Sequence, residues 1–567
     1  MTDIKGLESL VENTAYVQAQ QMDRNTLRDQ RRPLSLPRPK RPTELREEVG
    51  TNYLSLCEQQ PIGKKLFQQF LQSSSPQCQA AAEFLEELND WHFAEDEPKT
   101  KAKQKFLSKF FHPDSRSFLS FLTGDVVEMC KGLSSKNFDQ GILNKTREAT
   151  TDFLREAPFT EYQKSPFFYR FLQWKEYEKQ RINHMHFYEY RTIGKGGFGE
   201  VRVTNSTSFC FYLLMLLTCT VLQVCVVQAK HSGQMYACKK LDKKRLKKKG
   251  GEKLAMMEKQ ILEKVNSIFI VNLAYAFDDK THLCLIMDLM NGGDLGFHIY
   301  DLGTRGLCME RVVYYTAQIA TGILHLHSLN IIYRDMKPEN VLLDSRGHCR
   351  LSDLGLAVEL SNGKTICQKA GTTGYMAPEI LRQVFYSTSV DWWSLGCSVY
   401  EMVAARLPFK DFREKVQNEE VTRRTLEDEV KFTHRKFDAA TKDLIGGLLK
   451  KKPKLRLGCC GDDPRKHHFF KNINLNRLEA GLLQAPWSPK AHVVYAKNTH
   501  ELRESSQVQD VKLNDKDEQF YKEFSTGAVP IRWQREMIEN GVFDQLNDSQ
   551  LIGPHETVWD SKACVIL

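Results

Sequence analysis

The chain has 567 residues, of which 41% are hydrophobic, so it is long enough to bury several separate cores. Its 80 Lys and Arg residues nearly balance 71 Asp and Glu residues, and the resulting charge of +9 gives no reason to expect a nucleic-acid partner. The 15 cysteines contain no C-x-x-C pair, which argues against a zinc ribbon or a disulfide framework. We therefore expect a multidomain globular protein with reduced thiols.

The opening segment, residues 1–20, predicts a short amphipathic helix, with a frayed terminus as the alternative. Its apolar side chains fall near helical spacing at Ile4, Leu7, Leu10 and Val11. No apolar signal-peptide core is found in the first forty residues, so no secretory route is expected.

Residues 21–50 predict a basic, proline-rich linker. Four prolines in QRRPLSLPRPKRP disfavour a helix, and five arginines and lysines concentrate positive charge that suits anionic lipid. Ser35 follows Arg32 by three residues and is a candidate phosphosite for a basophilic kinase.

Residues 51–178 predict an all-α domain, because leucines and aromatic residues recur there at steps of three and four. Nothing in this region indicates catalysis. His92 and His112 lack cysteine or carboxylate partners at metal-ligand spacing, so both are interpreted as structural or surface residues.

From residue 187 to residue 470 the pattern changes to strands alternating with helices, and the region opens on IGKGGFGEV. Glycines at such spacing let backbone amides approach phosphates, although dinucleotide-binding folds use the same pattern. The residues of this candidate ATP-binding loop are Ile193, Gly194, Lys195, Gly196, Gly197, Phe198, Gly199, Glu200 and Val201.

Further motifs follow in the order typical of protein kinases. Lys239 in YACKK stands where a nucleotide-holding lysine belongs, and Glu258 follows 19 residues later as its candidate ion-pair partner. The stretches MAPE with Glu379, DWWSLG with Asp391 and LRLG with Arg456 complete the order expected of a large helical lobe.

The stretches YRDMKPEN and SDLGLA supply the residue types that phosphoryl transfer requires. Asp335 can orient an attacking hydroxyl and accept its proton, and Lys337 can offset charge on the moving phosphoryl group. Asn340 and Asp353 offer hard oxygen ligands for Mg²⁺. ATP and Mg²⁺ are therefore the predicted cofactors.

Taken together, these motifs make residues 187–470 resemble a basophilic protein kinase of the nucleotide-, lipid- and Ca²⁺-regulated group. LDKKRLKKKGGEK, MNGGDL and DLGLA more narrowly resemble the G protein-coupled receptor kinases, and LCEQQPIGKKLFQQFL resembles their regulator-of-G-protein-signalling (RGS) homology domain. The fold class implied is α+β, a bilobal protein kinase fold inserted in an all-α RGS-homology domain. The resemblance adds Asp288 and Met290 to the expected ATP-binding residues.

The part of the chain after residue 470 resembles the same family. Residues 471–536 resemble a regulatory kinase extension with returning RGS-homology helices, and residues 537–567 form a tail ending in CVIL. Cys564 in this C-a-a-X box favours geranylgeranylation and fits a prenylated visual member of the family.

The resemblance implies serine/threonine phosphorylation of activated receptors, with cone opsins as the expected substrates and receptor desensitisation as the outcome. It also implies anionic membrane lipids, a Gα subunit or a calcium sensor as further partners. The expected location is the cytoplasmic face of a membrane, held by a prenyl group, in the photoreceptor outer segment. A catalytically impaired scaffold that binds receptor or Gα is the alternative.

Activation-loop phosphorylation is not expected, because Gln368 stands where kinases of the broader group carry a phosphorylatable threonine. We therefore expect the N-terminal helix to order on an activated receptor and to stabilise the closed lobes.

Residues 202–224 contain an uncharged apolar run that separates the glycine loop from Lys239. A membrane span would place the two on opposite sides of a bilayer and destroy the ATP site. A loop insertion would expose a long apolar segment at a hairpin. Translated intron is the favoured interpretation, because deletion restores a short hairpin between the two strands.

Overall fold

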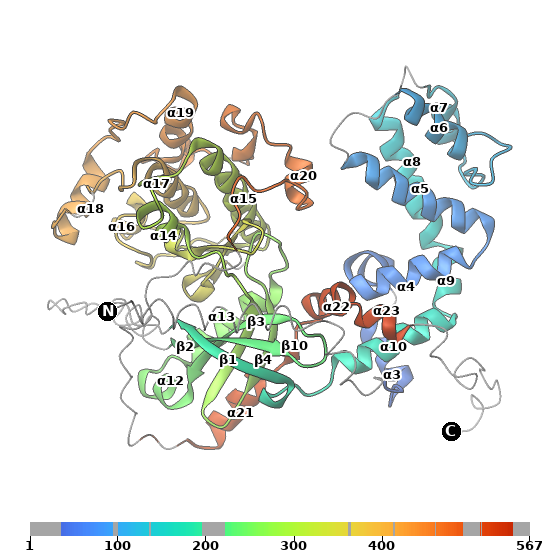
Figure 1. Ribbon diagram of the computed structural model, residues 1–567, viewed down its shortest axis with the longest axis horizontal. Helices are drawn as coiled ribbons and strands as arrows, with labels where there is room; N and C mark the ends of the chain where they lie inside the picture. Colours follow the sequence, from blue (N-terminus) through green and yellow to red (C-terminus); the bar gives the residue numbers. More distant parts are fainter. Residues whose placement is uncertain are drawn as a thin grey trace, which may run out of the picture. The chain divides into compact units, whose positions relative to one another are not determined.

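The computed structural model describes residues 36–50, 52–93, 100–134, 138–194, 221–360, 364–411, 414–459, 461–490, 511 and 513–547 (Figure 1). They form two compact units. The first comprises residues 182–529 and contains all the strands. The second is helical and joins the segment before residue 182 to the segment after residue 529.

The small lobe of the first unit is a six-stranded antiparallel sheet in the order β1-β2-β3-β5-β4-β10. Its strands are β1 (Phe187–Gly194), β2 (Val221–Ala229), β3 (Met235–Asp242), β4 (Leu273–Asp278), β5 (His282–Asp288) and β10 (Gly527–Ala528). Three described helices accompany the sheet, α12 (Lys243–Lys249), α13 (Glu252–Lys264) and α21 (Asp515–Phe524). The C-terminal extension therefore supplies the last strand of this lobe.

Strand β2 begins at Val221, inside the segment predicted to be foreign. Val224 is aligned with Gly194 of β1 and with Lys239 of β3, and Val221 is aligned with Leu241. The backbone register therefore extends β2 to Val221 on the side of β3. The expected edge at Val224 thus does not coincide with the start of the strand.

The large lobe is built around two long buried helices, α15 (Met309–Ser328) and α17 (Ser389–Ala404). Helix α17 is buried along almost its whole length, as expected for SVDWWSLGCSVYEMVA, which has no polar face. The other helices of the lobe are α14 (Leu295–Tyr300), α16 (Pro378–Leu381), α18 (Asn418–Glu427) and α19 (Ala439–Leu448). Two short hairpins pair β6 (Ile331–Ile332) with β9 (Val358–Glu359), and β7 (Val341–Leu343) with β8 (Cys349–Leu351).

The helical unit is divided in sequence by the first unit. Its leading part comprises α3 (Pro42–Val49), α4 (Pro61–Gln72), α5 (Pro76–His92), α6 (Thr100–Phe110), α7 (Asp125–Lys131), α8 (Gln140–Arg155), α9 (Ala157–Tyr162) and α10 (Pro166–Glu178). Helices α22 (Pro530–Glu539) and α23 (Val542–Leu546) return to it, and Trp174 packs against Trp533 and Phe543. These returning helices extend beyond residue 536, where the expected tail began.

Helix α3 corrects part of the predicted linker at residues 21–50. Pro42 occupies the first turn of the helix, where its missing N–H costs no hydrogen bond. Leu45 is buried, and the Arg46 guanidinium lies 5.1 Å from the centre of the Phe168 ring in α10. Proline therefore starts a packed helix here.

The C-terminal extension lies against the large lobe at Gly347, where the backbone φ is +87°. A Cβ atom at Gly347 would stand 1.7 Å from the Trp487 carbonyl oxygen, and the Trp487 ring also lies 5.0 Å from the Arg311 guanidinium. Only glycine permits this approach.

We expect Gly347→Ala to destabilise the first unit by about 1–3 kcal/mol and to release the extension to proteases. Thermal unfolding and limited proteolysis near Trp487 measure the two effects. Gly303→Ala is the matched control, because Gly303 also has positive φ but nothing lies within 4 Å of its added Cβ. Equal effects of both substitutions would show that the contact with Trp487 contributes nothing.

Candidate active site

The nucleotide side of the site is an ion pair between strand β3 and helix α13. Lys239 Nζ lies 2.6 Å from Glu258 Oε1 and 3.7 Å from Asp353 Oδ1. Burial works against the charged form of Lys239, but the two carboxylates outweigh it and raise the pKa of this amine. Lys239 therefore stays protonated at neutral pH and can hold phosphate oxygens.

Four side chains converge here: Asp335, Lys337 and Asn340 come from the loop between β6 and β7, and Thr372 comes from the segment between β9 and α16. Asp335 Oδ2 accepts hydrogen bonds from Lys337 Nζ at 2.7 Å and from Asn340 Nδ2 at 2.8 Å. Asp335 Oδ1 accepts from Thr372 Oγ1 at 2.6 Å, and Lys337 Nζ also donates to Thr372 at 2.9 Å. The carboxylate is thus held in one orientation at a largely buried position.

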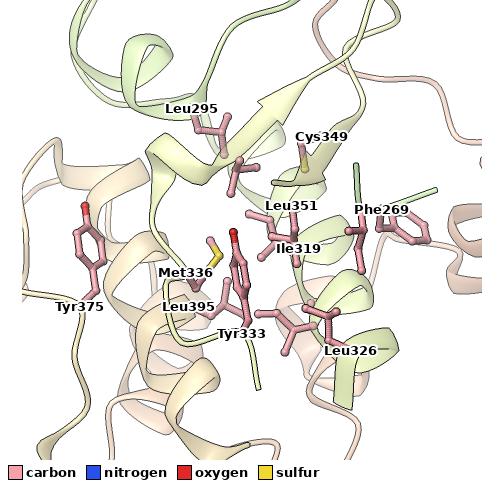
Figure 2. Close-up of a cluster of buried hydrophobic side chains, with 14 of the residues drawn as sticks. Phe269, Leu295, Ile319, Leu326, Tyr333, Met336, Cys349, Leu351, Tyr375 and Leu395 are labelled. Atoms are coloured by element: carbon pink, nitrogen blue, oxygen red, sulfur yellow. The ribbon is translucent and has the colours of Figure 1, made fainter. Parts of the chain in front are cut away.

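The backbone of this loop is anchored on the large-lobe core. Asp391 of α17 is fully buried, and its carboxylate accepts from the backbone N–H groups of Tyr333 and Arg334 at 2.9 and 2.8 Å. Figure 2 shows the side chains of Tyr333 and Met336 within a cluster of buried apolar residues. The residues around Asp335 are therefore fixed by both packing and hydrogen bonds.

The oxygen donors expected for Mg²⁺ fit that ion. Asn340 Nδ2 donates to the Asp335 carbonyl and carboxylate, which fixes the orientation of the Asn340 amide. Its Oδ1 takes no part in these two bonds and is the atom that could bind a cation. Asp353 has a positive φ of 50° and a side chain that is 53% exposed. Carboxylate and amide oxygens are hard ligands of the kind that Mg²⁺ prefers.

Between the two lobes, Asp288 ends β5 and is buried. Its carboxylate pairs with Arg350 at 2.7 Å and accepts from Asn272 Nδ2 at 3.1 Å. Any contact of Asp288 with a nucleotide is therefore expected from its main chain. Met290 follows at a half-buried position.

Several predicted site residues lie outside the described part of the chain. Ile193 and Gly194 end strand β1, but the rest of the glycine loop, Lys195, Gly196, Gly197, Phe198, Gly199, Glu200 and Val201, is not described. The same applies to Ser35, to Cys564 and to residues 1–20, for which a helix was predicted.

Two functional contacts were missed by the sequence reasoning. Thr372 bonds to both Asp335 and Lys337, and Gln368 Oε1 accepts from Arg334 NH1 at 2.7 Å. No local sequence signal showed that Thr372 reaches a carboxylate 37 residues earlier.

Four of the eight basic side chains between Lys239 and Lys249 form ion pairs, which speaks against a dedicated lipid patch. Besides Lys239, Lys240 pairs with Glu189, Lys243 with Asp278 and Lys247 with Asp517, each at 2.5–2.7 Å. These ion pairs join β3 to β1, α12 to β4 and α12 to the C-terminal extension.

Glu401 of α17 is a buried carboxyl between the hydroxyl groups of Tyr300 and Tyr375. Burial raises its pKa from the ordinary 4.5 to about 7, while the two hydroxyl donors oppose the shift and the nearby Glu339 adds to it. Folded protein therefore keeps Glu401 protonated at pH values where the unfolded chain has lost the proton.

The raised pKa of Glu401 makes stability depend on pH. The free energy that the protonated carboxyl contributes to folding is complete below pH 4.5 and is lost as pH rises through about 7. We expect the local free energy of opening of α17, measured by hydrogen exchange, to fall by about 2 kcal/mol between pH 5.5 and 7.5 relative to Glu401→Gln. Parallel pH profiles of wild type and variant would contradict this.

The small lobe contributes a lysine–glutamate ion pair, and the large lobe contributes a hydrogen-bonded aspartate and two oxygen donors for a cation. This combination defines a protein kinase. The protein kinase domain family matches residues 221–470, and the regulator of G protein signaling domain family matches residues 52–171. The predicted fold class, a bilobal kinase inserted in an RGS-homology domain, is confirmed.

Known relatives resemble the chain over almost its whole length. It is 58% identical to rhodopsin kinase grk7a of Danio rerio, covering 97% of this chain and 96% of the relative. It is 59% identical to rhodopsin kinase grk7-b of the same organism, covering 100% of both. It is 52% identical to rhodopsin kinase GRK7 of Homo sapiens, covering 97% and 96%.

The chain therefore belongs to the G protein-coupled receptor kinase family, among its GRK7 rhodopsin kinases. It is a serine/threonine protein kinase that uses ATP and Mg²⁺. No helix in the described parts of the chain is both long and apolar enough to cross a membrane.

Proposed function

We propose that this kinase transfers the γ-phosphoryl group of ATP to serine and threonine residues of light-activated opsins, with cone opsins as the main substrates, and so starts desensitisation. The observation that carries the proposal is the set of hydrogen bonds that orients Asp335 between Lys337, Asn340 and Thr372. The substrate follows from the names of the relatives, which are rhodopsin kinases.

The residues have distinct roles in this proposal. Asp335 orients the substrate hydroxyl and accepts its proton, while Lys337 offsets charge at the transferred group. Lys239, held by Glu258, positions the phosphates, together with the glycine loop from Ile193 to Val201. Asn340 and Asp353 hold Mg²⁺, which neutralises charge on the phosphate oxygens when bound.

The test uses the full chain with purified cone opsin and labelled ATP. Incorporation into illuminated opsin, and little incorporation in the dark, is expected. Equal labelling in light and dark would contradict receptor-activation dependence, and no labelling of opsin with intact labelling of a peptide would contradict the substrate. The ion pair of Lys239 with Glu258 supports a working enzyme over the impaired scaffold.

Receptor engagement is proposed to order the N-terminal helix formed by residues 1–20. Leu7→Ala is expected to lower phosphorylation of illuminated opsin, because it removes part of the apolar face. Phosphorylation of a soluble peptide is measured in parallel. Unchanged rates on both substrates would refute a role for this helix.

Membrane attachment is proposed to come from geranylgeranylated Cys564 with help from the basic residues between Arg31 and Arg41, placing the kinase on the cytoplasmic face in photoreceptor outer segments. A single lipid chain binds weakly, and a basic patch adds to it on anionic lipid. Mass spectrometry of Cys564 and flotation of Cys564→Ser with anionic vesicles test the two contributions. A Gα subunit and a calcium sensor remain candidate partners for pull-down from photoreceptor extract.

For residues 202–224, we keep the proposal that most of the segment is translated intron. Pairing of Val221 with Leu241 moves the proposed boundary toward residue 220. Sequencing the native transcript across this junction decides the matter, and a message containing all the codons would refute it.

A further inference from the structure

Arg334, the residue before Asp335, carries a buried guanidinium without an ion-pair partner among the described residues. Its Nε donates to the Leu356 carbonyl at 2.6 Å, and NH1 donates to Gln368 Oε1 at 2.7 Å and more weakly to the Tyr386 hydroxyl at 3.4 Å. Arg334 is only 8% exposed. A buried cation of this kind depends on its hydrogen-bond acceptors, since water cannot replace them.

Gln368 is the side-chain acceptor that the activation segment contributes. Arginine has no acceptor atom, so the amide oxygen of Gln368 must face it. The Gln368 carbonyl in turn accepts from the Tyr386 hydroxyl at 2.7 Å, and Ile366 and Tyr386 exchange backbone hydrogen bonds at 3.0 Å. The glutamine is therefore held from its own backbone while its side chain reaches the catalytic loop.

The contact spans two parts of the active site. Arg334 adopts a left-handed conformation with φ of 67° and directly precedes Asp335 in the chain. Thr372, four residues after Gln368, bonds to Asp335 Oδ1. Leu356, the third partner, follows Asp353 by three residues. Arg334 thus connects the loop that carries Asp335, the segment that follows Asp353 and the segment that carries Gln368 and Thr372.

We propose that Gln368 is a positioning residue for phosphoryl transfer: its neutral amide holds Arg334 and so fixes Thr372 and Asp335 relative to one another without phosphorylation of the segment. This rests on the proposed roles of Asp335 and Thr372. A charged acceptor at position 368 serves the same purpose, because hydrogen bonds to arginine are stronger when the acceptor is ionised. An apolar side chain of similar size does not.

The experiment compares Gln368→Leu, Gln368→Glu and Cys367→Ala in the full chain, with a soluble peptide substrate and varied ATP. Cys367 is the control, because its exposed thiol donates only to the Gln383 carbonyl. We expect Gln368→Leu to lower kcat about 10- to 100-fold with KM for ATP within about twofold of wild type. Gln368→Glu is expected to keep or raise kcat, and Cys367→Ala to leave it unchanged.

A double-mutant cycle with Arg334→Met separates positioning from general damage. If Gln368 acts through Arg334, Gln368→Leu lowers kcat less than about twofold in that background. Loss by the same factor in both backgrounds, or a loss in Gln368→Glu as large as in Gln368→Leu, would overturn the inference. Should Arg334→Met fail to fold, the Leu and Glu variants decide it alone. An inactive wild type would instead refute the proposed function.

Discussion

Replacing Asp335 by asparagine is expected to lower kcat by about 10²–10⁴-fold, the usual contribution of a positioned general base. Asparagine keeps the size of the side chain and can still bond to Lys337 or Thr372, but it cannot accept the proton of the substrate hydroxyl. KM for ATP is expected to stay within a few fold, since Lys239 and Glu258 do not contact Asp335. Initial rates on illuminated opsin and on a peptide measure the effect.

Asp462→Asn is the matched control, because Asp462 is an exposed carboxylate of the large lobe. It is expected to leave kcat within about twofold of wild type, as surface substitutions usually do. Retained kcat in Asp335→Asn would remove Asp335 from the reaction as its base. Binding of illuminated opsin by Asp335→Asn shows that the loss is in catalysis.

The largest effect on stability is expected for Arg456→Met, at about 3–5 kcal/mol. Arg456 donates NH1 to Glu379 Oε1 at 2.7 Å and NH2 to Oε2 at 3.0 Å, and its side chain is fully buried. It also donates to the Ser389 and Lys450 carbonyls. Methionine fills similar space but leaves the Glu379 carboxylate buried without its cation, and thermal unfolding of the kinase measures the cost.

Arg423→Met provides the comparison for this prediction. Arg423 pairs with Glu420 on the surface of α18, where both side chains are more than a third exposed, and solvent screening makes such pairs contribute little to stability. The double variant Glu379→Leu/Arg456→Met is expected to be less destabilised than the sum of its single variants, because neither charge is left unpaired. Equal effects of Arg456→Met and Arg423→Met would refute the buried-pair argument.

Much of the active site was predictable because its residues lie in short motifs on definite elements. The spacing between Lys239 and Glu258 predicted their ion pair, and the structure places the two side chains 2.6 Å apart. YRDMKPEN carried Asp335, Lys337 and Asn340 within one loop. The residues of YRDMKPEN are close because they share one loop, whereas the partner of Lys239, 19 residues away in α13, was expected from the order of the kinase motifs.

Predictions about segment boundaries were less accurate. The proline-rich stretch was expected to be a linker throughout, yet α3 begins at Pro42 and buries Leu45. Proline disfavours a helix interior but is tolerated in the first turn, and only packing on α10 showed which applied. Strand β2 likewise begins at Val221, which pairs with Leu241 of β3, and its pairing with β1 is seen from Val224 onward.

By itself the sequence determined the kinase class, the order of its motifs and the residue types for ATP, Mg²⁺ and proton transfer. The tertiary structure alone decided that Gln368 holds Arg334, that Arg456 pairs with Glu379 across 77 residues, and that Gly527–Ala528 completes the small-lobe sheet. The reason is physical: motif residues are close because the chain is continuous, whereas these partners meet only after the core fixes the register of distant elements.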